Sequence, residues 1–187
     1  MERVTISDQE LIARQMGRVP RGDYVIARRC IHGFPQVLQV PPVVEEKPFP
    51  TLYWLTCPLF CRAVSELEGG GWVGRLEQRL AAEAELRTAL ERADVEYVAA
   101  RRRLLTAKEE RELAERGQLR ELDARGIGGI ADRRRLKCLH LHVAHALVDR
   151  NPIGDIVLGM LVQSACEPEK TICSSLGGER SRSQINR

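Results

Sequence analysis

The sequence predicts an α+β fold: a small antiparallel three-stranded sheet packed against helices, with a long charged helical segment. Two observations support this prediction. Three short apolar runs bounded by turn residues occupy the first third of the chain, and a proline-free stretch rich in Ala, Leu, Glu and Arg follows them. The 187 residues are enough for one domain with its own core, and we expect that domain to span 1–165.

Three strands are predicted, each from a run of β-branched or aromatic residues between turn residues. They cover 24–30, 36–40 and 51–56, and the short connections between them favour an antiparallel arrangement. Before the first strand, Ser7 and Glu10 have the spacing of a capping box. This spacing predicts a short N-terminal helix.

Helices are predicted for the rest of the domain. Pro58 suits the first position of a helix that runs to the glycines at 69–71. Leucines spaced at fours and sevens indicate one extended helix or a helical hairpin over 75–125. Two further helices are expected over 136–148 and 153–163.

The composition excludes some classes of protein. Basic residues number 29 and acidic residues 26, so the net charge of +3 makes nucleic acid an unexpected partner. No run approaches the ~18 apolar residues of a membrane span. The polar N-terminus lacks a secretory pattern, which predicts a cytoplasmic protein whose six cysteines are thiols or metal ligands. Polar and small residues predominate over 166–187, which predicts a disordered tail.

Cysteine and histidine are concentrated between Cys138 and His145. In a helix, residues four and seven positions apart share one face, so Cys138, His142 and His145 form one stripe and His140 points away. Thiolate and imidazole are donors that zinc and iron favour. The stripe therefore predicts either a metal site or a set of core side chains.

Two more cysteines lie where predicted strands end. Cys30 closes the first strand, and Cys57 lies between the third strand and the next helix. If both junctions fall at one end of the sheet, Cys30, Cys57 and Cys138 can converge on a zinc ion, with His142, His145 or His32 as the fourth ligand. The alternatives are an iron–sulfur cluster on the same three cysteines, a nucleophilic thiol at the helix N-terminus, or structural core cysteines. The remaining cysteines receive no functional role: Cys61, Cys166 and Cys173.

Glycines followed by basic residues form a candidate anion site. Gly128 and Gly129 permit close backbone approach, while Arg133 and Lys137 at the start of the next helix favour a phosphate or carboxylate. The alternative is a plain turn between helices with a solvated basic flank. If the chain is instead an interaction module, the charged segment 75–125 is the expected surface for a protein partner.

Several segments occur in the order found in one bacterial family: 29–30, 33–37, 48–58, 65–68, 126–129, 137–145 and 151–154. Together they resemble the family called domain of unknown function five hundred and one, and the resemblance covers roughly residues 10–160. It implies a bacterial protein without an assigned activity, in which the cysteine and histidine segments belong to one shared site. We therefore expect a zinc site, with a small anionic substrate if the metal keeps an open position.

Overall fold

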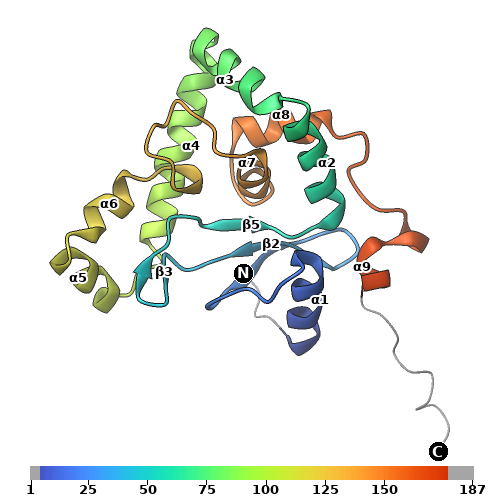
Figure 1. Ribbon diagram of the computed structural model, residues 1–187, viewed down its shortest axis with the longest axis horizontal. Coiled ribbons are helices and arrows are strands. Elements are labelled where there is room, and N and C mark those ends of the chain that lie inside the picture. The colour runs from blue at the N-terminus through green and yellow to red at the C-terminus, as the bar shows by residue number, and fades with distance from the viewer. Residues whose placement is uncertain (1–4, 177–187) are drawn as a thin grey trace, which may run out of the picture.

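The computed structural model describes residues 5–176 and has the α+β fold expected from the sequence (Figure 1). One antiparallel sheet has three strands, and two shorter strands form a separate ribbon. In chain order the elements are α1 (Ile6–Met16), β1 (Val25–Arg29), β2 (Pro35–Gln39), β3 (Val43–Val44), β4 (Lys47–Pro48), β5 (Tyr53–Leu55), α2 (Pro58–Gly69), α3 (Trp72–Ala82), α4 (Ala84–Arg102), α5 (Ala107–Glu115), α6 (Gln118–Ala124), the 3-10 turn η1 (Ile127–Gly129), α7 (Leu139–Ala146), α8 (Pro152–Met160), the 3-10 turn η2 (Pro168–Lys170) and α9 (Ile172–Leu176).

The three-stranded sheet has the order β1-β2-β5 and buries both of its faces. Side chains of the central strand alternate between the faces, as the pleat of a strand requires. Val37 joins the larger core with Val143 of α7, whereas Leu38 packs with Ile12 of α1 in a smaller core. Figure 1 shows α1 on one side of the sheet and most of the other helices on the opposite side.

Helix α7 lies at the centre of the larger core. The consecutive helices α2, α3 and α4 form an arch around it, and α8 packs alongside (Figure 1). Leu139, Val143 and Ala144 of α7 are fully buried in the apolar cluster that includes β2 and β5. Burying one leucine side chain stabilises the fold by about 2 kcal/mol. Contacts on several sides therefore hold the polar side chains of α7 in place.

The segment 75–125, predicted as one helix or a hairpin, is instead divided among the four helices α3 to α6. The chain turns at Glu83, where the Arg87 guanidinium donates hydrogen bonds to carbonyl groups at the end of α3. A capping box of Thr106 and Glu109 begins α5. Within residues 5–176, none of the helices combines the length and apolar character needed to cross a membrane.

The first helix is capped by Thr5 and Asp8 rather than by the predicted pair Ser7 and Glu10. The Thr5 hydroxyl accepts from the Asp8 backbone N–H, and the Asp8 carboxylate accepts from the Thr5 N–H at 3.1 Å. The same carboxylate binds both terminal nitrogens of Arg29 on β1, at 2.9 and 3.0 Å. This contact, with the cap, lowers the pKa of Asp8 to about 2 and ties α1 to the sheet.

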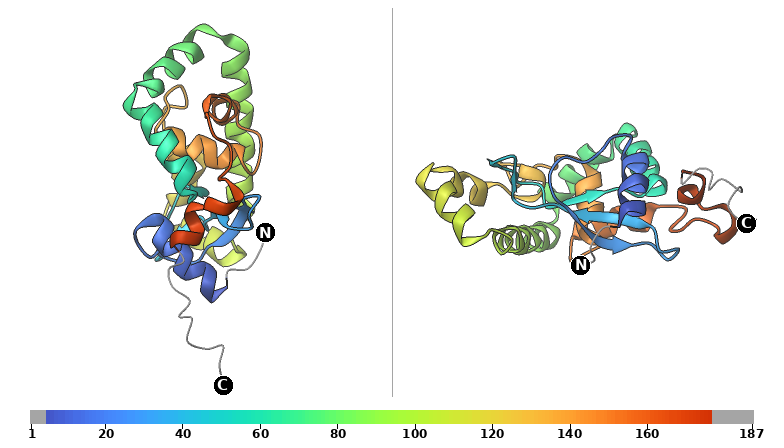
Figure 2. Two further views of the ribbon diagram at one scale, coloured as in Figure 1. Left: turned by 90° about the vertical axis from the view of Figure 1, so that its right-hand side faces the viewer. Right: turned by 90° about the horizontal axis from the view of Figure 1, so that it is seen from below.

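The sequence predicts a disordered tail from 166, whereas the structure places η2 and α9 in this region. Helix α9 packs against α1 and α2 (Figure 2). Cys173 is buried there, and the Gln15 side-chain amide donates hydrogen bonds to its sulfur (3.2 Å) and to the Pro35 carbonyl (2.9 Å). The chain is therefore ordered at least to residue 176, and the rest of the predicted tail, 177–187, lies outside the described residues.

Candidate metal site

Helix α7 begins later than predicted, and this changes which side chains meet. The sequence indicates a helix from residue 136, but the helix begins at Leu139, and Cys138 is the N-cap with φ −160° and ψ 156°. An extended backbone takes the Cys138 side chain out of the helical stripe that contains His142 and His145. The structure therefore does not bring Cys138 together with these two histidines.

Cys138 lies instead beside Glu68 of α2 and His140 in the first turn of α7. One ligand atom from each of the three side chains lies within 4.8 Å of the other two. Oε1 of Glu68 accepts hydrogen bonds from the Leu139 backbone N–H (2.5 Å) and from Nδ1 of His140 (3.1 Å). The second ring nitrogen of His140, Nε2, lies 3.1 Å from the Cys61 carbonyl oxygen. A sulfur, a nitrogen and an oxygen donor thus face one another where α2 contacts α7.

The surroundings of His140 favour its charged form. A hydrogen bond to the Cys138 side chain is the main cause of a pKa raised to about 9. Partial burial opposes the rise, whereas the negative charge of Glu68 and the Cys61 carbonyl reinforce it. The ring is therefore an imidazolium at neutral pH, and it donates from Nδ1 to Glu68 and from Nε2 to Cys61.

His142 and His145, two of the predicted metal ligands, point into the core. Burial lowers the pKa of each to about 4, so both are neutral. The Asn151 side-chain oxygen accepts from the Gly154 N–H at 2.9 Å and also lies 3.3 Å from Nδ1 of His142. The Asn151 amide nitrogen lies 3.0 Å from Nδ1 of His145, to which it donates, and 3.2 Å from Nδ1 of His142. His145 also stacks on Tyr53, with the ring centres 5.7 Å apart.

Cys30 and Cys57 lie away from Cys138, so the predicted convergence of these three thiols is not formed. Both line a cavity of about 370 Å³, and Cys138 does not. The two other cysteines that line this cavity, Cys166 and Cys173, belong to the region predicted as a tail. The sequence-based ligand set is therefore divided between two places in the fold.

The side chains expected to bind an anion have partners within the protein. Nη1 of Arg133 lies 2.9 Å from the Asp94 carboxylate, and Nζ of Lys137 donates to the Gly128 carbonyl at 3.1 Å. Neighbouring side chains fill the space beside Gly128 and Gly129, both of which have a positive φ. The helix N-terminus required by the prediction is also absent, because α7 begins only after residue 138.

Glu68 was not recognisable as a site residue from local sequence patterns. Helical phase correctly separated His140 from His142 and His145, but it wrongly placed Cys138 on the stripe of the two core histidines. Glu68 belongs to a different helix and meets Cys138 only through tertiary packing. One signal was available. The segments 65–68 and 137–145 both carry the family resemblance, and they are the two segments that meet at this site.

A comparison with protein families agrees with that resemblance. The family model described as "Protein of unknown function (DUF501)" matches residues 26–159, a range that includes Glu68, Cys138 and His140 as well as Cys30 and Cys57. No curated protein and no solved structure matches the chain.

Proposed function

We propose that this chain, which belongs to the DUF501 family of proteins of unknown function, binds a zinc ion through Glu68, Cys138 and His140. The observation that carries the proposal is the closeness of three different donor atoms, all within 4.8 Å of one another. Thiolate, imidazole and carboxylate are the groups with which proteins bind zinc. Among the described residues, no other group of three Cys, His, Asp or Glu side chains lies this close.

The hydrogen bonds around His140 support a ligand role. Nδ1 faces Glu68 and is the ring nitrogen that a metal would share with the carboxylate. Nε2–H can keep its hydrogen bond to the Cys61 carbonyl, and metal-bound histidines commonly use such a contact to fix the ring orientation. The protein thus holds the ring from the side opposite to the proposed ion.

Three protein ligands leave a fourth position for water, as in zinc enzymes that activate a bound water for hydrolysis. Solvent can reach this position, because the side chains of Glu68 and His140 are 25% and 27% exposed. The anionic substrate expected from the sequence has no support at this site, because Arg133 and Lys137 are bonded elsewhere. We therefore propose a bound metal at this site and assign it no substrate.

Zinc content tests the proposal. After zinc loading and dialysis, we expect Cys138→Ser and His140→Ala to retain about one zinc per chain less than the unsubstituted protein. Cys61→Ser is the matched control, because its side chain bonds to Leu55 rather than to the site and its carbonyl is unchanged by the substitution. In the cobalt(II) form, the thiolate-to-metal charge-transfer band of this site should be present in the unsubstituted protein and in Cys61→Ser, weakened in His140→Ala and absent from Cys138→Ser. Equal zinc content in all four proteins would refute the site.

Zinc binding should also release protons. His140 has a pKa of about 9 in the metal-free protein, so a metal must displace its proton at neutral pH. The affinity for zinc should therefore increase as the pH rises towards 9. Calorimetric titrations in buffers of different ionisation enthalpy count the protons released, and His140→Ala should release fewer.

A further inference from the structure

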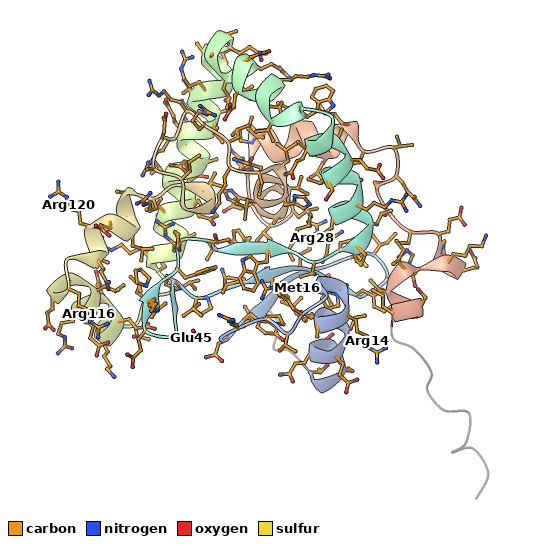
Figure 3. All side chains as sticks on the ribbon, in the orientation of Figure 1. Arg14, Met16, Arg28, Glu45, Arg116 and Arg120 are labelled. Atoms are coloured by element: carbon orange, nitrogen blue, oxygen red, sulfur yellow. The ribbon has the colours of Figure 1, made fainter. Side chains whose placement is uncertain are left out.

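Four of the six cysteines line one cavity, which lies between β1, α2 and the C-terminal segment. The thiols come from four separate parts of the chain: Cys30 follows β1, Cys57 precedes α2, Cys166 lies between α8 and η2, and Cys173 belongs to α9. Figure 3 labels Arg28, a residue of β1 that lines the same cavity. The cavity shares no residue with the proposed zinc site and is a second concentration of metal-binding side chains.

Local contacts position these cysteines. Cys30 lies in the turn between β1 and β2, where its carbonyl accepts from the Gly33 N–H at 2.9 Å. Nε2 of His32, which also lines the cavity, lies 2.9 Å from the Cys166 carbonyl oxygen and so connects this turn to the C-terminal segment. The Cys173 sulfur accepts its hydrogen bond from α1. The thiols are therefore held by tertiary contacts rather than by a shared short motif.

We propose that Cys30, Cys57, Cys166 and Cys173 bind an iron–sulfur cluster in this cavity, a function beyond the zinc site. Four cysteine thiolates are the usual ligand set of such clusters. A single zinc ion, at Zn–S distances of about 2.3 Å, would draw its sulfurs to within about 4 Å of each other. No three of these thiols lie within 4.8 Å of one another, and the cavity of about 370 Å³ is far larger than an ion requires. Thiols distributed around such a space fit a ligand with several metal atoms.

The walls of the cavity suit an anionic cluster. Arg28 lines the cavity, and its guanidinium, held by the Leu147 carbonyl at 2.6 Å, can offset part of the negative charge of a cluster. Aliphatic side chains such as Leu161 also line the cavity and limit the access of water. Binding of a cluster would displace the protons of the cysteine thiols that hold it.

This ligand set differs from the cluster considered from the sequence. Cys30 and Cys57 are common to both, but Cys166 and Cys173 take the place of Cys138, which belongs to the other site. A cluster would also join the C-terminal segment covalently to the sheet and to α2. The cluster would thus cross-link segments that are otherwise held by packing and a few hydrogen bonds.

Anaerobic reconstitution of the full chain with ferric iron, sulfide and dithiothreitol, in which the thiol reduces part of the iron, tests the proposal. We expect bound iron accompanied by acid-labile sulfide, broad visible absorbance, and a paramagnetic resonance signal in one of the two redox states. Cys57→Ser and Cys166→Ser should lose most of the iron and sulfide, whereas the control variants Cys61→Ser and Cys138→Ser should retain them. Because Cys138→Ser removes a ligand of the proposed zinc site only, failure of one site can be distinguished from failure of the other.

A second measurement needs no substitution at the cavity and so does not depend on the folding of a variant. In the unsubstituted protein, reconstitution should protect the four cavity cysteines from alkylation, as read by peptide mass spectrometry, and leave Cys138 reactive. The proposal is overturned if no sulfide accompanies the iron, if both cavity variants load normally, if these cysteines bind zinc alone, or if they form disulfides with each other.

Discussion

The two sides of helix α7 hold histidine side chains in opposite charge states. On the side that faces α2, His140 meets Cys138 and Glu68, and its pKa is raised to about 9. On the side that faces the core, His142 and His145 are 4% and 1% exposed, and burial lowers the pKa of each to about 4. A single short helix thus carries a charged histidine and two neutral ones.

The charge state of these histidines therefore depends on the groups that surround each ring and not on the residue type. On the core side an amide and aromatic rings surround the imidazoles. The charge of Asp149 raises the pKa of His145 by less than the loss of hydration lowers it. On the α2 side a carboxylate and a thiol lie beside the ring. The α2 side therefore has the donor atoms of a metal site, and the core side has the contacts of a packed interior.

The largest expected loss of stability comes from a substitution on the core side of α7. Asn151 is fully buried, caps α8 and lies within hydrogen-bond distance of Nδ1 of both core histidines, so Asn151→Ala should lower the free energy of unfolding by about 3 to 4 kcal/mol. The loss combines a missing cap with two buried ring nitrogens that lose their Asn151 hydrogen bond. Urea unfolding followed by circular dichroism measures it, and a loss below about 1 kcal/mol would contradict the described contacts.

Asn151→Asp is the matched control for that experiment. The carboxylate keeps the oxygen that caps α8 but has no N–H for the histidines, and its charge favours their protonation. Nuclear magnetic resonance titration should show a higher pKa for at least one of His142 and His145. The pKa of His140 should stay unchanged.

The second effect is a loss of stability in acid caused by the core histidines. An unfolded histidine takes up its proton near pH 6.5, whereas His142 and His145 do so only near pH 4 in the folded state. The unfolded state therefore binds more protons between these values, and stability falls as the pH drops through them, by about 3 kcal/mol for the first histidine to be protonated. Asp8, with a pKa of about 2, adds its own loss only below pH 4. A flat profile between pH 6.5 and 4 would disprove the buried neutral pair.

The third effect concerns the α2 side, where the dependence of stability on pH has the opposite sign. In chelator-treated protein, the contribution of His140 is complete below pH 6.5 and is lost as the pH rises through about 9, because the folded state binds the extra proton. Glu68→Gln keeps an oxygen for the Leu139 N–H but removes the charge. We expect the pKa of His140 to fall by about 1 unit and stability at neutral pH to fall by about 1 kcal/mol, since the site is partly solvated.

The decline in stability at acid pH, which is caused by the core histidines, is the internal control for Glu68→Gln. Stability should still decline between pH 6.5 and 4 in this variant, because the core histidines are unaffected, while the decline at alkaline pH should shrink. If magnetic resonance shows an unchanged pKa for His140, Glu68 is not its electrostatic partner.

The smallest effect is expected from Ser65→Ala. Its exposed hydroxyl lies 3.3 Å from Nε2 of His140, but that nitrogen also has the Cys61 carbonyl at 3.1 Å. The free energy of unfolding should change by less than about 0.5 kcal/mol. A loss above about 1 kcal/mol in urea unfolding would show that the hydroxyl, rather than the carbonyl, orients the ring.

Local chemistry made much of the fold predictable. Three apolar runs predicted the three strands of the sheet, and Pro58 predicted the start of α2, because strand pleating and helix capping depend on neighbouring residues. The capping box at Thr106 and Glu109 was also readable and would have divided the segment 75–125 in two. The break at Glu83 was not, since it depends on a guanidinium that reaches back to the preceding helix.

The amino-acid pattern was therefore sufficient for the fold class, for the approximate positions of strands and helices, and for the cysteine and histidine residues, though not the glutamate, of the proposed metal site. Tertiary structure alone decided which of those residues meet. The extended backbone of Cys138 turned its side chain towards Glu68, and the packing of α7 buried His142 and His145. Secondary structure follows from periods of a few residues, but a site is built from donors far apart in the chain, whose distances depend on how the helices pack.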